Sequence, residues 1–154
     1  MKSNNESSQF VESILNILSK LPFGLRTSIM KNRMDEFLSF DDEEKNEIVL
    51  NIFMNYPKID ETSLNNLIDS WLSNLVAMPN GKINELLYRY LLMLSINPAV
   101  MENFNKDIIN KLSSKLEGMS DDNQTKLKNC VFEMILNTPA PDDLLALIPK
   151  DLMR

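Results

Sequence analysis

The acidic run at residues 41–44, Asp-Asp-Glu-Glu, is the densest group of titratable side chains in the sequence. Neighbouring carboxylates are hard oxygen ligands, so the run could attract a divalent cation. The ligand spacing and the glycine of an EF-hand loop are absent, and acidic side chains are also favoured at the positive end of a helix. We therefore interpret this run, and the pair Asp121-Asp122, as the first turns of helices, and expect no metal site.

The chain contains no histidine and a single cysteine, Cys130. Without histidine there is no imidazole for general acid–base catalysis, for a Ser-His-Asp or Cys-His arrangement, or for metal ligation. One cysteine provides neither an internal disulfide nor a zinc cluster, and its position between Leu127 and Met134 on one helical face predicts core packing. Three isolated glycines cannot form a phosphate-binding loop. The sequence predicts a non-catalytic protein without a metal or cofactor.

Arg89 is the only charged residue between Leu86 and Ile96, in the most apolar segment of the chain. An unpaired guanidinium is costly to bury, so this side chain needs a partner or a route to water. One interpretation is an anion or a partner's carboxylate in an apolar pocket. The other, which we expect, is a pair with Glu85, four residues earlier on the same helical face.

Aromatic side chains provide the candidate surface for a protein partner. Tyrosine and arginine are enriched in binding hot spots, and the second helices of stacked helical pairs line one common face. The alternative is that the aromatic side chains pack in the core, where such residues bury much area. The candidate partner-binding residues are Phe53, Tyr56, Tyr88, Arg89, Tyr90 and Phe132.

Composition is that of an ordinary globular protein, with 44% hydrophobic and 25% charged residues in 154. We expect a disordered tail at residues 1–7 and a single domain at 8–154. The net charge of −6 argues against nucleic acid as a partner. The longest apolar run is too short to cross a bilayer core of about 30 Å, so no membrane insertion is expected. One cysteine and no signal-like segment favour the cytoplasm.

Apolar residues recur at steps of three and four, and no segment alternates with a period of two, which predicts an all-α fold. Asp41 and Ser120 are expected to cap helices, Gly118 to adopt a left-handed conformation after a helix, and residues 79–81 to form a turn. The predicted helices span residues 8–20, 25–38, 42–55, 62–77, 83–96, 99–117, 122–137 and 142–148.

Three apolar segments end at prolines that lie 41 residues apart, Pro57, Pro98 and Pro139. The residue before a proline is disfavoured in the α region, and proline suits the first position of a helix. Each proline is therefore expected to mark a corner between helices, with Asn97 and Thr138 as caps of the next helix.

The spacing of 41 residues resembles that of HEAT-like two-helix repeats, about 40–47 residues. We predict a compact array of antiparallel helix pairs, with three such repeats and terminal capping helices; a bundle without repeats is the alternative. The helix at 83–96 is apolar on all sides, so it is expected to be central, with Leu86, Leu91 and Met93 nearly inaccessible to solvent.

These observations favour a protein–protein interaction module, an adaptor or regulatory subunit, that binds another protein through a helical face. A homodimer is compatible with the same surface. The alternative is a carrier of a small apolar ligand or lipid held between helices near residues 86–94.

Overall fold

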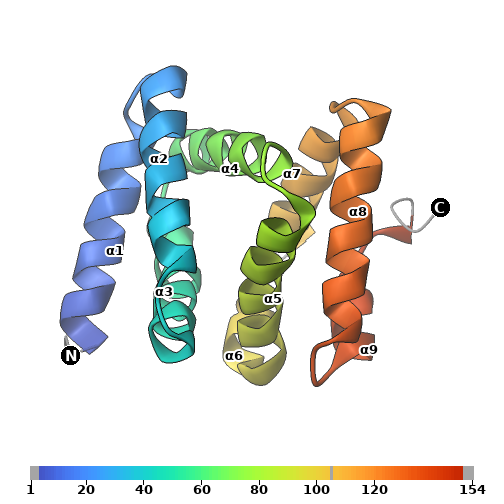
Figure 1. The fold of residues 1–154 in the computed structure, drawn as a ribbon. Helices are drawn as coiled ribbons and strands as arrows, with labels where there is room; N and C mark the ends of the chain where they lie inside the picture. The colour runs from blue at the N-terminus through green and yellow to red at the C-terminus, as the bar shows by residue number, and fades with distance from the viewer. Residues whose placement is uncertain (1–3, 105, 151–154) are drawn as a thin grey trace. The chain divides into compact units, whose positions relative to one another are not determined.

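The computed structural model describes residues 4–104 and 106–150, which form nine α-helices, one short 3-10 helix and no strand (Figure 1). The predicted all-α fold of packed helix pairs is confirmed for this part of the chain. None of the described helices is both long enough and apolar enough to cross a membrane. Contacts within the chain divide it into two compact units, Met1–Ala77 and Met78–Arg154.

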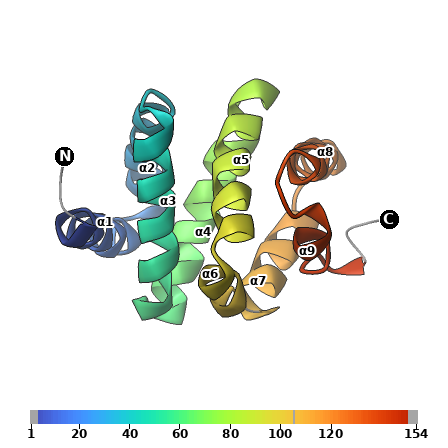
Figure 2. The same cartoon turned by 90° about the horizontal axis from the view of Figure 1, so that it is seen from below.

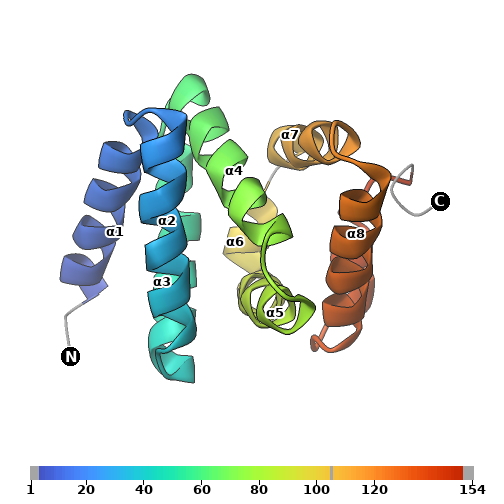
Figure 3. The ribbon, with the colours of Figure 1, turned by 45° about the horizontal axis from the view of Figure 1, so that its top comes forward.

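The first unit contains four α-helices and the 3-10 helix, η1. Helix α1 packs against α3 and α4, and α2 packs against α4 and, less extensively, against α1. Figures 1 and 3 show α1 and α2 side by side, joined at one end by a short turn. The bounds are α1 Asn4–Ser19, α2 Phe23–Leu38, α3 Asp42–Asn55, η1 Tyr56–Lys58 and α4 Glu61–Val76.

The second unit is built on the pair α5–α8, and the short helices α6 and α9 also pack on α5. Helix α9 lies beside α8 as well, as the view from below shows (Figure 2). The bounds are α5 Asn80–Ile96, α6 Pro98–Asn103, α7 Lys106–Glu117, α8 Asp121–Leu136 and α9 Pro141–Leu145. A single domain over residues 8–154 stays a prediction.

At the chain's start, helix α1 begins at Asn4, so residues 4–7 of the predicted tail lie in a helix. Residues 1–3 lie outside the described residues.

Two predicted helix caps are confirmed. Asp41 Oδ1 accepts a hydrogen bond from the backbone N–H of Glu44 at 2.8 Å, at the start of α3. Ser120 Oγ accepts one from the N–H of Asn123 at 3.2 Å, at the start of α8. Each bond satisfies one of the N–H groups that the first turn of a helix leaves without a partner.

The predicted caps at Asn97 and Thr138 are wrong, because both side chains bind the preceding helix instead. Asn97 Nδ2 donates to the carbonyl oxygen of Met93 at 2.7 Å, and Thr138 Oγ1 donates to that of Ile135 at 2.6 Å. The last four carbonyls of a helix lack N–H partners, so these donors close the old helix rather than open the new one.

The prolines mark corners in three different ways. Pro98 is the first residue of α6, as predicted. Pro57 lies within the 3-10 helix that follows the end of α3 at Asn55. After α8, Pro139 belongs to the turn and Pro141 begins α9. The φ angle that the proline ring fixes is compatible with each of these positions.

Three further local predictions are wrong. Asn80 and Gly81 begin α5 rather than forming a turn, and Gly118 is not left-handed, since no described glycine has a positive φ. The predicted helix 99–117 breaks at Phe104, where ψ of 84° leaves the helical region, and α7 starts at Lys106.

Helix α5 buries one stripe rather than its whole circumference. Leu86 and Met93 are buried as predicted, but Leu91 is only half-buried. The buried apolar positions are Ile83, Leu86, Leu87, Met93 and Leu94. They lie on one side of the helix, and Leu91, four residues after Leu87 and three before Leu94, lies at the edge of that stripe, where it is half-buried.

Leu86, with 2% of its surface exposed, provides a test of the core. We expect Leu86→Ala to lower the free energy of unfolding by about 2–5 kcal/mol, because it removes buried methyl groups and leaves a cavity. Leu91→Ala, at the half-buried edge of the stripe, should cost clearly less. Urea titrations of the two variants make the comparison, and equal losses would contradict the burial of α5 described above.

Gly81 provides a second test, because it is the second residue of α5 and a Cβ built on it meets no atom within 4 Å. Gly81→Ala should raise the free energy of unfolding by about 0.4–1 kcal/mol, since alanine loses less backbone entropy on folding. Thermal unfolding measures the change. A destabilised Gly81→Ala protein would show that this residue is not helical.

Candidate functional site

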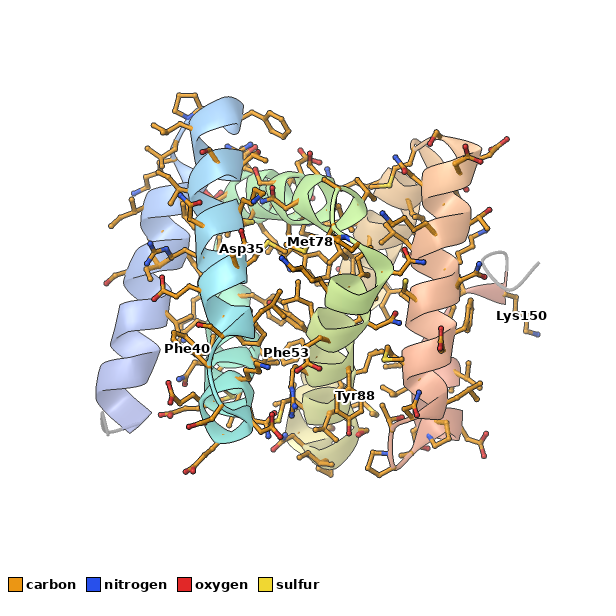
Figure 4. All side chains as sticks on the ribbon, in the orientation of Figure 1. Asp35, Phe40, Phe53, Met78, Tyr88 and Lys150 are labelled. Carbon is orange, nitrogen blue, oxygen red and sulfur yellow. The ribbon has the colours of Figure 1, made fainter. Side chains whose placement is uncertain are left out.

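The six predicted partner-binding residues are divided between the two units. Phe53 lies near the end of α3 and Tyr56 begins η1, whereas Tyr88, Arg89 and Tyr90 lie on α5 and Phe132 on α8. Figure 4 labels Phe53 and Tyr88. Phe53 and Arg89 are buried, and the other four side chains are half-buried. None of the six is among the exposed side chains, so each is at least partly covered by the fold.

Phe53 and Tyr56 contact one another within the first unit. Their ring centroids are 6.5 Å apart with an interplanar angle of 74°, which is an edge-to-face arrangement. Burial also raises the pKa of the Tyr56 hydroxyl, because a phenolate is poorly solvated there. The pair anchors the end of α3.

Arg89 pairs with Glu85, as predicted. The Nε group of Arg89 donates to Glu85 Oε1 at 3.3 Å, and the guanidinium carbon lies 5.4 Å from the centre of the Tyr88 ring. Glu85 thus compensates the buried charge within the same helix, and the ring face offers a further favourable contact.

Cys130 is buried, so its predicted packing role is confirmed. Burial raises the pKa of the thiol, and the nearby carboxylate of Glu133 raises it further, while Lys126 acts in the opposite direction. Since the thiolate is the reactive form, this environment makes Cys130 a weak nucleophile.

The acidic run at residues 41–44 is exposed and forms the cap and first turn of α3. The pKa of Glu44 is raised, chiefly by the hydrogen bond and the negative charge of Asp41. Within residues 4–104 and 106–150, no three His, Cys, Asp or Glu side chains are placed to hold a metal ion.

A second buried arginine, Arg26, was not predicted. It is 5% exposed and lies on α2. Its Nε donates to Ser70 Oγ at 2.8 Å, its Nη1 donates to the carbonyl of Leu21 at 2.7 Å, and its guanidinium carbon is 5.6 Å from the Phe23 ring centre. In the described part of the chain, all the partners of Arg26 are neutral.

One sequence signal could have identified Arg26. The buried residues of α2 are Arg26, Met30, Met34 and Phe37, at steps of four, four and three. Arg26 therefore occupies the first position of the apolar stripe that faces the interior.

Ser70 and its neighbours extend the contact into a network between α2 and α4. The hydroxyls of Ser70 and Thr27 are 2.9 Å apart, and Asn74 Nδ2 donates to the carbonyl of Thr27 at 3.0 Å. Ser70 is fully buried, so its hydroxyl has only these partners to replace water. The network fixes the register of the two helices.

The turn between α1 and α2 exposes large apolar side chains. Ile17 is 63% exposed, Phe23 52% and Leu25 51%, and Pro22 between the helices is exposed as well. We call residues 17–25 the α1–α2 corner. The other exposed large apolar side chains of the described residues are Met54, Ile96 and Leu136, each at or next to the last residue of a different helix.

Comparison of the chain with protein-family models, with curated proteins and with solved structures finds no match.

The buried network provides a test. Ser70→Ala removes the acceptor of Arg26 Nε, and a buried donor left without a partner costs about 1–3 kcal/mol of stability. The matched control is Ser73→Ala, at a half-buried position on the same helix, for which we expect a change within about 0.5 kcal/mol. Equal stability of the two variants in urea unfolding would show that the Arg26–Ser70 bond contributes nothing.

Proposed function

We propose that this chain is a non-catalytic protein–protein interaction module of the cytoplasm, an adaptor or regulatory subunit, that binds another protein through a helical face. The observation that carries the proposal is the exposure of Ile17, Phe23 and Leu25 at the α1–α2 corner. An exposed apolar side chain gains free energy when a partner covers it, and three of the six exposed large apolar side chains of the described residues lie within nine positions of the sequence.

The corner, rather than the predicted aromatic set, is the proposed first contact. Phe53 and Arg89 are buried and already have partners within their own units. The half-buried Tyr56, Tyr88, Tyr90 and Phe132 have less free surface to offer a partner than Phe23, of which half is exposed.

The proposal includes three HEAT-like repeats of about 41 residues, supported first by the ends of α3, α5 and α8. Each end carries an exposed apolar side chain, an asparagine and then a proline, as Met54-Asn55, Ile96-Asn97 and Leu136-Asn137 show. Each asparagine donates through Nδ2 to the carbonyl four residues earlier, at 2.8, 2.7 and 2.9 Å. The same chemistry thus closes three helices at similar spacing.

The order of packing is the second support for repeats. The most extensive packing within the two units joins α1 to α3, α2 to α4 and α5 to α8. If α6 and α7 are counted together as the one predicted helix, every pair joins helices that are two positions apart. Stacking of equivalent helices from consecutive repeats has this pattern.

Affinity purification of the full chain from its native cell tests the proposed function. We expect a protein in stoichiometric amount that rebinds the purified chain, because the exposed corner favours a partner. The double variant Phe23→Ser, Leu25→Ser should lose it, whereas Leu136→Ser, which removes an exposed apolar side chain elsewhere, should retain it.

Mass spectrometry of the proteins and of an organic extract gives the measurement, with circular dichroism as the control for folding. A stoichiometric lipid or other apolar ligand in the extract, without a protein partner, would favour the carrier and contradict the proposal.

A further inference from the structure

We propose that the α1–α2 corner binds a segment of a partner protein that carries a carboxylate next to large apolar side chains. This inference rests on the proposed function and adds the chemistry of the partner. The apolar part follows from Ile17, Phe23 and Leu25, which would be covered by side chains of similar size.

The carboxylate follows first from Arg26. The guanidinium is buried, its carbon lies 5.6 Å from the centre of the exposed Phe23 ring, and its hydrogen bonds go to the hydroxyl of Ser70 and to the carbonyl of Leu21 in the corner. Arg89, the other buried arginine, has the carboxylate of Glu85. The positive charge of Arg26 is not neutralised by a described side chain, and charge of this kind is felt strongly where water is scarce.

The start of α2 adds to the positive potential at the same place. The residue before the helix is Pro22, which makes no side-chain cap, and the first turn holds no acidic side chain. The first N–H groups of a helix lack intrahelical partners and carry a positive partial charge, so a carboxylate is favoured next to them. Arg26 and the exposed apolar side chains distinguish this start from an ordinary uncapped one.

Nearby charged side chains leave the corner positive. Residues 13–34 contain four basic residues and no acidic one, although the chain as a whole carries −6. Lys31 and Arg33 pair with Asp35 and Glu36 further along α2. Asp60 lies near Lys20, and hydrogen bonds from the N–H and hydroxyl of Ser63 lower the pKa of its carboxylate. This carboxylate therefore stays negative and offsets Lys20, which leaves Arg26 as the cation without a compensating carboxylate among the described residues.

A protein segment fits this corner better than an anionic membrane. Membrane adsorption needs a cluster of lysines and arginines, because each contributes little alone. The corner has only Lys20, with Arg26 directly after it, and the net charge of −6 repels an anionic surface. A partner segment with one carboxylate among apolar side chains suits the one buried guanidinium and the one helix start that this chain offers here.

Gly24 makes the proposal testable at a single position. It is the second residue of α2, is exposed, and a Cβ built on it meets no atom within 4 Å. Gly24→Asp supplies a carboxylate to the helix start from within the chain, whereas Gly24→Ala adds only the methyl group. Both variants should fold at least as stably as the wild type, and the aspartate should repel a partner's carboxylate.

The probe is a phage-displayed library of random dodecapeptides, selected on the purified full chain and then resynthesised with a fluorophore. We expect the selected peptides to be enriched in Asp or Glu next to aromatic residues or leucine. In fluorescence anisotropy, Gly24→Asp should weaken binding about tenfold or more relative to Gly24→Ala, and rising salt should weaken it for the wild type. Phe23→Ser should abolish binding, and Leu136→Ser should leave it unchanged.

Several results would overturn the proposal. These are selected peptides without acidic residues, equal binding by the two Gly24 variants, or failure to select any peptide. Corner-dependent binding to vesicles of phosphatidylserine and phosphatidylcholine would indicate a membrane instead, and corner-dependent sedimentation as a dimer would indicate a second copy. If the purified cellular partner depends on Phe23 but not on the charge at Gly24, the proposed function stands and this inference fails.

Discussion

The hydrogen bond from Arg26 Nε to Ser70 Oγ is the constraint on which the first unit depends. A buried guanidinium must keep its hydrogen bonds, so α2 can lie on α4 only in the register that brings these two side chains together. Thr27 and Asn74 reinforce that register one turn further along. With Arg26 facing inward, its neighbours Phe23 and Leu25 are left at the surface. The contact that orders the interior therefore also determines which side chains the corner exposes.

Helix ends impose the second constraint, which acts in both units. The carbonyls of a last turn need donors, and the side chains of Asn97 and Asn137 supply them at the ends of α5 and α8. Asn55, the last residue of α3, makes the same kind of bond to Asn51, one turn further back. The prolines restrict the preceding residue at Asn97, which has left the helical region, but not at Tyr56, which keeps φ −59° and ψ −33° before Pro57. They do not determine which helix an adjacent polar side chain will bind. Asn97, with φ −122° and ψ 88°, is placed to reach back to Met93, and its side chain makes no bond to the helix that follows.

Hydropathy periodicity predicts the fold class and most helix bounds, and α3 has its predicted bounds of 42–55. This works because each helix buries a stripe that the sequence displays directly. It fails where tertiary packing decides between local alternatives. No proline or glycine marks the break at Phe104, and Leu91 differs from Leu86 only in its position around α5. The two buried arginines differ in the signal that their neighbours give. The apolar sequence around Arg89 indicates burial directly, whereas Arg26 is followed by polar residues and is buried because it lies on the stripe of Met30, Met34 and Phe37.

Arg26 and Arg89 have similar surroundings, except that only Arg89 has a carboxylate beside it. Each guanidinium lies over an aromatic ring of its own helix, at 5.6 Å from Phe23 and 5.4 Å from Tyr88. At Arg89 a carboxylate one turn away completes the set, and the charge is neutralised within the helix. At Arg26 a serine hydroxyl and a carbonyl take the hydrogen bonds, which satisfies the donors but leaves the charge. Hydrogen bonding and charge compensation are separate requirements. The first unit supplies the hydrogen bonds of Arg26 from its own residues. It does not supply a compensating charge, which under our proposal comes from a partner bound at the exposed apolar corner.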